Sequence, residues 1–213
     1  MAVMSNENHG LQILDEGGNL LIEVGPYVVD DVQGFAAAVG AVASTWAQTE
    51  INLYCLFAVL LNTTPEVAEA RLKKYGTAKK VTDEARRIAV GNLTGVELQI
   101  VNEALDSLDA VRLLRNRVQH DTWARKAADR KRLYRVHRDQ YLAFALKLLN
   151  VQQLTGTPAE SEAIRDAMRF PGEISEGYSV PEVEKIARDI DGVSKLLLKA
   201  MFTIRISQVR ASS

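Results

Sequence analysis

The residues whose types and spacing suit chemistry lie together near the middle of the chain, in the run Arg115-Asn-Arg-Val-Gln-His120. On a helix, Asn116 and His120 share one face because they are four residues apart, and Arg115 lies about 100° around from Asn116. A guanidinium, an amide and an imidazole are thus expected near one buried edge. Since an imidazole can act as general acid or base near neutral pH, the run predicts acid–base chemistry. The alternative is a histidine that caps the helix beside a surface arginine.

The element expected to position these residues is a helix that begins at Thr94 and ends near His120. The run Thr94-Gly-Val-Glu97 has the form of a capping box. The apolar stripe of this helix consists of Val101, Leu105, Leu108 and Val111. Four residues after Val111 the spacing predicts another core residue, and Arg115 stands at that position.

The rest of the sequence predicts an all-α fold. We expect a compact helical bundle with a long N-terminal helix, a motif helix ending near residue 120 and a short extended N-terminal segment. Residues 1–28 form this segment, with β-like alternation that allows one hairpin. Residues 29–213 form a single helical domain, with an insertion at about 141–178.

The long N-terminal helix is expected over about residues 30–61, and it is apolar over much of its circumference. Such a helix is buried on several sides, so Cys55 is expected to be a small buried hydrophobe. Glu50 is the only charged residue between Val32 and Leu61. It either pairs with Arg115 or His120, because an unpaired buried carboxylate is costly, or lies on an exposed polar strip.

Composition excludes several classes of protein. The chain has 213 residues, 47% of them apolar, with 26 Lys+Arg and 27 Asp+Glu, which excludes intrinsic disorder. One cysteine excludes a disulfide framework and a cysteine-based zinc cluster, and three scattered histidines suggest no metal site. No apolar run approaches the roughly 18 residues of a membrane span. We expect a soluble cytoplasmic protein that uses no cofactor or metal and has no membrane partner.

The charge is unevenly distributed along the chain. Residues 1–70 contain nine acidic residues and no Lys or Arg, whereas residues 112–138 contain ten basic and two acidic residues. The basic stretch is either a phosphate-binding surface for RNA or a solvated face that pairs with the acidic N-terminal third. The candidate RNA-binding residues are Arg117, Arg125, Lys126, Arg130, Lys131, Arg132, Arg135 and Arg138.

The run from Arg115 to His120 resembles the R-x4–6-H motif of the HEPN superfamily, in which the residue after Arg is often Asn, as Asn116 is here. The resemblance implies a homodimer and a metal-independent endoribonuclease, often a toxin or antiviral effector with a neutralising antitoxin partner. His120 would be the acid and base at the ribose 2′-hydroxyl or the leaving oxygen. Arg115 would hold the scissile phosphate, and Asn116 would orient a partner by hydrogen bonding.

Two features depart from the pattern of the family or leave its activity open. Asp121 stands where relatives often have Gly or another small residue, so it either orients His120 or caps the turn. Together with Glu50 it is a candidate supporting residue. The alternative function is a non-catalytic HEPN-like helical dimer that acts as an RNA-binding or protein-interaction module.

Overall fold

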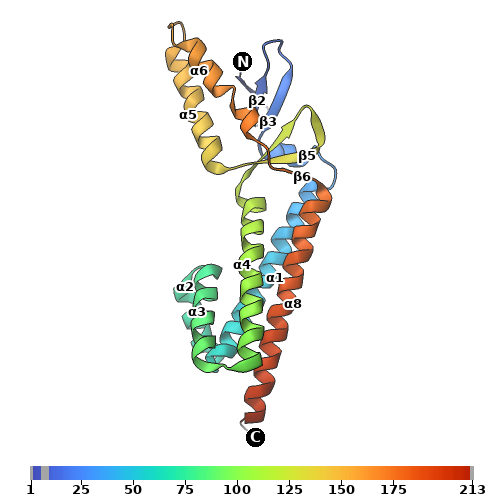
Figure 1. The fold of residues 1–213 in the computed structure, drawn as a ribbon, viewed down its shortest axis with the longest axis vertical. Coiled ribbons are helices and arrows are strands. Elements are labelled where there is room, and N and C mark those ends of the chain that lie inside the picture. The colour runs from blue at the N-terminus through green and yellow to red at the C-terminus, as the bar shows by residue number, and fades with distance from the viewer. Residues whose placement is uncertain (1, 6–9, 212–213) are drawn as a thin grey trace. The chain divides into compact units, whose positions relative to one another are not determined.

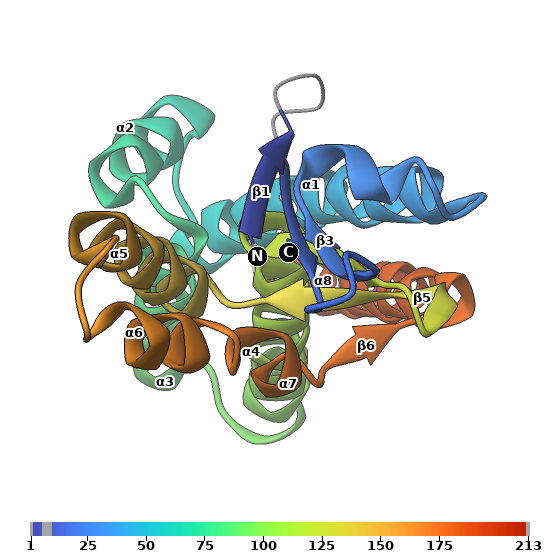
Figure 2. The same ribbon diagram turned by 90° about the horizontal axis from the view of Figure 1, so that it is seen from above.

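The structure, a computed structural model, describes residues 2–5 and 10–211. Over these residues the chain is mostly helical and also contains one antiparallel sheet (Figures 1 and 2). The predicted predominance of helix is confirmed, but the all-α class is wrong because the sheet was not expected. Much of the sheet is built from the stretch that follows the motif helix.

The chain divides into two compact units that interleave along the sequence. Unit 1 comprises residues 1–39 and 116–183, and unit 2 comprises residues 40–115 and 184–213. Three long helices supply residues to both units: α1 (Phe35–Leu61), α4 (Gly95–His120) and α8 (Val180–Ala211).

Unit 1 is built on the antiparallel sheet, in which each strand pairs with its neighbour in the sequence. The expected N-terminal hairpin is confirmed as the β2–β3 pair, with Ile13 opposite Ile22. Strand β3 then pairs with β4, and Val24 lies opposite Ala124. This pairing joins the N-terminal hairpin to the segment directly after the motif helix. The strands are β1 (Ala2–Ser5), β2 (Gly10–Leu14), β3 (Leu20–Val24), β4 (Thr122–Lys126), β5 (Asp129–Val136) and β6 (Gly177–Tyr178).

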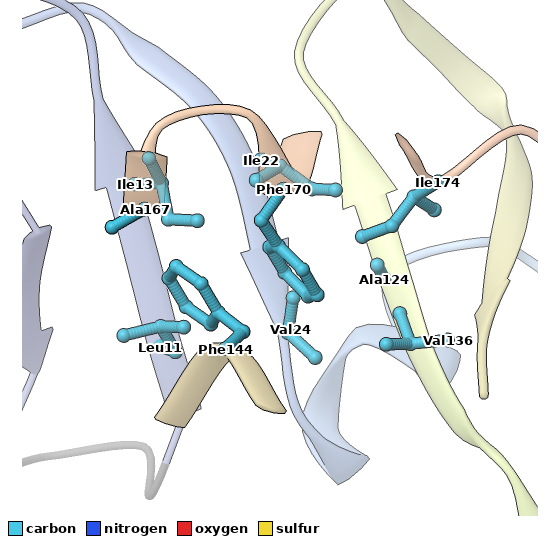
Figure 3. Close-up of a cluster of buried hydrophobic side chains, with 10 residues drawn as sticks. All are labelled: Leu11, Ile13, Ile22, Val24, Ala124, Val136, Phe144, Ala167, Phe170 and Ile174. Atoms are coloured by element: carbon cyan, nitrogen blue, oxygen red, sulfur yellow. The ribbon is translucent and has the colours of Figure 1, made fainter. Parts of the chain in front are cut away.

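One face of this sheet is covered by the stretch expected as an insertion. It contains α5 (Arg138–Leu154), α6 (Glu160–Ala167) and α7 (Phe170–Glu173), and α5 and α6 lie side by side (Figures 1 and 2). Phe144 and Phe170 stack with their ring centroids 4.0 Å apart. Figure 3 shows both rings against the apolar side chains of the strands. The buried cluster consists of Leu11, Ile13, Ile22, Val24, Ala124, Val136, Phe144, Ala167, Phe170 and Ile174.

Unit 2 is helical and follows the local signals of its sequence. Besides its parts of α1, α4 and α8, it contains α2 (Pro65–Tyr75) and α3 (Ala78–Asn92). Helix α2 begins with Thr64 as N-cap and ends at Gly76, whose φ of 66° is left-handed and suits glycine. The predicted stripe on α4 is buried, from Val101 to Val111.

Helix α1 differs from the expectation in two respects. It begins at Phe35, after a short 3₁₀ helix, η1 (Pro26–Val29). Cys55 is exposed, so the prediction of a buried thiol is wrong. The reason is that small residues make α1 apolar on its outer face too, and the sequence then does not show which side faces the core. Among the described residues, no helix is long and apolar enough to cross a membrane.

Candidate functional site

The three motif residues lie in the last turns of α4, which is continuous from Gly95 to His120. The division between the two units falls between Arg115 and Asn116. Successive residues of a helix are about 100° apart, so Asn116 and His120 project from nearly the same side of α4. Over five residues, the same geometry separates the directions of Arg115 and His120 by about 140°. The guanidinium and the imidazole therefore leave one helix on different sides.

Arg115 belongs to unit 2, where α1 surrounds its side chain with an aromatic ring and an acid. The guanidinium carbon lies 5.4 Å from the centroid of the Trp46 ring, a cation–π distance. Burial lowers the pKa of Arg115, and the negative charge of Glu50 opposes that shift. The charge of Glu50 thus acts on Arg115, whereas the predicted pairing of the two residues stays a prediction. The charge of Arg115 is therefore held in a half-buried position against an aromatic ring, within the electrostatic influence of Glu50.

His120 belongs to unit 1 and is exposed at the end of α4. It lines an open pocket of about 560 Å³ together with residues of η1, of the start of α1 and of β4. Trp123 forms a wall of this pocket, and its buried ring makes edge contacts with Phe35 and Tyr178. Trp123 is thus anchored in the interior of unit 1. An accessible imidazole beside a rigid wall is suited to proton transfer with a bound ligand.

Asp121, the residue after His120, forms an ion pair with Arg135 of β5. Arg135 also binds Glu176, which precedes β6, through its guanidinium, and its backbone N–H donates to the Glu176 carbonyl at 2.8 Å. Glu176 accepts a hydrogen bond from the hydroxyl of Tyr178 at 2.5 Å and lies 3.7 Å from the guanidinium of Arg117. Burial raises the pKa of Glu176, but the Tyr178 hydrogen bond and the Arg135 charge outweigh burial and lower it.

Sequence reasoning missed this cluster around Asp121. Arg135 was placed on an RNA-binding surface, and Glu176 was not considered because it lies far along the chain, in the stretch expected as an insertion. No local signal connects Glu176 with Asp121, since the pairing of β5 with β6 is what brings them together. The cluster ties the end of α4 to two strands.

Half of the predicted RNA-binding set is occupied by acids of the same chain. Arg125 pairs with Glu23 and, at 3.0 Å, with Asp31, both in the acidic N-terminal third. Arg132 pairs with Glu182 at 2.6 Å. Arg117 and Arg135 share Glu176, as described above. Of these four arginines, Arg125 pairs with the acidic N-terminal third, as the alternative interpretation predicts. The acids that bind the other three lie later in the chain, at Asp121, Glu176 and Glu182.

The remaining basic side chains of the set have no acidic partner within the described ranges. Lys126 lies 4.7 Å from the centroid of the Tyr134 ring. Arg130, Lys131 and Arg138 are exposed. Thr122 pairs with Val136, so Arg138 lies near the end of the sheet that adjoins His120, whereas Arg130 lies at the hairpin tip. At about 3.4 Å per residue, the six steps from residue 130 to residue 136 span about 20 Å.

The family of the chain is not shown by comparison. No family model, no curated protein and no solved structure matches the chain. The HEPN resemblance therefore rests on the residues of the motif and stays a prediction. Among residues 2–5 and 10–211, no group of three or more His, Cys, Asp and Glu side chains is placed to hold a metal ion.

Proposed function

We propose that the protein is a metal-independent endoribonuclease of HEPN type. The observation that supports this most is the position of His120, which is exposed in the last turn of the motif helix and lines an open pocket. Exposed cations lie at both ends of the adjoining hairpin, Arg138 just beyond the end near His120 and Arg130 and Lys131 at the tip, where a negatively charged backbone would bind.

In the proposed reaction His120 takes the proton of a ribose 2′-hydroxyl. The 2′-oxygen then attacks the neighbouring phosphorus, the bond to the 5′-oxygen breaks, and a protonated imidazole supplies the proton that the leaving oxygen needs. The products are a 2′,3′-cyclic phosphate and a free 5′-hydroxyl. Arg115 holds the scissile phosphate, and Asn116 orients a partner by hydrogen bonding.

The proposed site requires two chains. The HEPN resemblance implies a homodimer, and the separation of about 140° between Arg115 and His120 on α4 favours a site to which two chains contribute. In a homodimer with two-fold symmetry, the imidazole of one chain approaches the guanidinium of the other, and the site occurs twice.

The first test is cleavage of a defined single-stranded RNA in the presence of EDTA. We expect the wild type to give fragments that end in a cyclic or 3′ phosphate, and His120→Ala to lose at least about 10²-fold in rate. His137→Ala is the matched control, because His137 is also an exposed histidine of unit 1 and lies outside the motif. It should cleave at the wild-type rate. A substrate with a 2′-deoxyribose at the cleaved position should remain intact.

The second test is complementation between two inactive variants. A mixture of Arg115→Ala and His120→Ala chains forms heterodimers with one intact composite site, so about a quarter of the wild-type rate should return. Undiminished cleavage by His120→Ala, or cleavage of the 2′-deoxy substrate, would refute the proposed reaction. Folded variants that never complement one another would refute the two-chain site.

One observation favours the second candidate function, a non-catalytic RNA-binding or protein-interaction module. The Arg115 guanidinium already lies against the Trp46 ring and is stabilised by the charge of Glu50, which is what a structural arginine would show. This function predicts that the protein shifts the mobility of RNA without shortening it, and that His120→Ala binds as tightly as the wild type.

A further inference from the structure

The ion pair between Asp121 and Arg135 lies directly behind the end of the motif helix. The Arg135 side chain is 14% exposed and that of Asp121 is 10% exposed, so the pair is largely removed from solvent. Breaking such a pair by removing one partner leaves a buried charge without compensation. The carboxylate of Asp121 is therefore fixed in place much more firmly than a carboxylate at an exposed helix end.

This fixed carboxylate belongs to the residue next to His120. Helix α4 ends at His120, and β4 begins at Thr122, so Asp121 is the single residue in which the chain changes from helix to strand. The direction of the His120 side chain depends on the backbone of this junction. An ion pair that anchors Asp121 therefore limits the directions in which the Cα–Cβ bond of His120 can point.

Arg135 is itself held from a second side. Its guanidinium binds Glu176 as well as Asp121, and its backbone N–H donates to the Glu176 carbonyl. Glu176 in turn accepts from Tyr178, whose ring contacts Trp123 in the wall of the His120 pocket. A planar guanidinium can bind two carboxylates in fixed directions, which a lysine cannot do.

We propose that Arg135, clamped between Asp121 and Glu176, is a positioning residue that fixes the direction of the His120 imidazole. This rests on the proposed function, in which His120 transfers the proton. It gives the stretch at 141–178 a role at the site, since that stretch delivers Glu176 to Arg135. Arg135 touches no substrate in this proposal and acts only through Asp121.

The test compares Asp121→Asn with Asp121→Asn/Arg135→Met. In the single variant, the amide oxygen of residue 121 can still accept a hydrogen bond from Arg135. In the double variant, the guanidinium that binds residue 121 and Glu176 is gone, and no unpaired carboxylate remains at residue 121. Because small misplacement of a reacting group is costly, kcat should be about 10- to 100-fold lower in the double than in the single variant, with KM within about twofold. The ring-proton NMR signals of His120, identified by their loss in His120→Ala, should also move between the two variants.

A matched control exists in unit 2. There Arg86 binds two carboxylates in the same way, Asp106 at 2.5 Å and Asp109 at 2.8 Å. Asp109→Asn and Asp109→Asn/Arg86→Met should have the same kcat and the same His120 signals. Similar melting temperatures for the two double variants would show that loss of folding is not the cause.

Two results would overturn the proposal. One is equal kcat and unchanged His120 signals in Asp121→Asn and Asp121→Asn/Arg135→Met. The other is an equal fall of kcat in the Arg86 control. If the wild type cleaves no RNA at all, the proposed function fails, and the His120 signals alone then decide whether Arg135 controls the imidazole.

Discussion

Glu23 lies in β3, the second strand of the N-terminal hairpin, and is 5% exposed, which is unusual for a carboxylate. Gln12 donates to it from the neighbouring strand, and Arg125 binds it from β4, with the guanidinium Nε 3.1 Å from a carboxylate oxygen. Arg125→Met removes the charge of the partner but keeps most of its apolar stem. We therefore expect this substitution to leave a buried carboxylate with one neutral donor.

The magnitude follows from the burial of the pair. Removing one member of a buried ion pair costs about 3–5 kcal/mol. The lower end applies here, because the Arg125 side chain is 26% exposed and Gln12 still donates. Arg125→Met should lower the free energy of unfolding by about 3 kcal/mol, and the double variant Glu23→Gln/Arg125→Met by about 1 kcal/mol or less. Adding Glu23→Gln to Arg125→Met should therefore restore about 2 kcal/mol.

Urea unfolding can follow unit 1 alone. The chain has two tryptophans, Trp123 in unit 1 and Trp46 in unit 2. In a Trp46→Phe background the remaining fluorescence reports the surroundings of Trp123. All four members of the cycle are measured in this background. If Arg125→Met is no less stable than the double variant, the reasoning from buried charge is refuted.

Two further predictions concern stability. Hydrogen bonds from Ser179 and the charge of Arg132 lower the pKa of Glu182 from 4.5 to about 2. The stabilisation by Glu182 is therefore complete above pH 4.5 and is lost as the pH falls toward 2, and Glu182→Gln should flatten this part of a stability–pH curve. Because the side chain is half exposed, the loss at neutral pH should be only about 0.5–1 kcal/mol. In unit 2, the Asn52 amide donates to the buried Ser194 hydroxyl at 2.6 Å. Asn52→Ala should lower the free energy of unfolding in denaturant by about 1–3 kcal/mol, and addition of Ser194→Ala should restore part of this loss. A stability–pH curve that Glu182→Gln leaves unchanged would contradict the first prediction. A double variant no more stable than Asn52→Ala would contradict the second.

The helices of unit 2 could be predicted because their signals are local. A Thr-Pro start and a Gly end mark α2, and apolar residues at helical spacing mark the buried side of α4. Each signal depends on residues within one or two turns, so a single sequence contains it. The same holds for the position of His120 at a helix end.

The hairpin of β4 and β5 could not be predicted from the same kind of signal. Its two-residue connection is Ala127-Ala128, which lacks the Asn-Gly or Asp-Gly pair typical of tight hairpins. Pairing is irregular between Ala124 and Lys126, and this interrupts the alternation that identifies a strand. The stretch is also rich in Lys and Arg, and Arg125 and Arg132 pair with acids distant in the sequence.

The candidate site also combines an interaction that the sequence could suggest with interactions that it could not. Proximity of Glu50 to Arg115 was one of two open expectations, because helical spacing restricts which residues can meet across packed helices. The attachment of Asp121 to Arg135 and Glu176 depends on which strands pair, and strand pairing is a long-range property of the fold.

The interleaving of the two units determines when each can be completed during synthesis. The β2–β3 hairpin leaves the ribosome early, but β3 has no neighbour on its second edge until β4, about 100 residues later, has been made. The helices at 40–115 likewise cannot complete their packing until α8, the last helix of the chain, has been made. Neither unit can finish from a contiguous fragment, so every growing chain carries an open strand edge and unpaired apolar helix faces for most of its synthesis. We expect folding to be slow for the size of the chain and sensitive to chaperones that cover such surfaces.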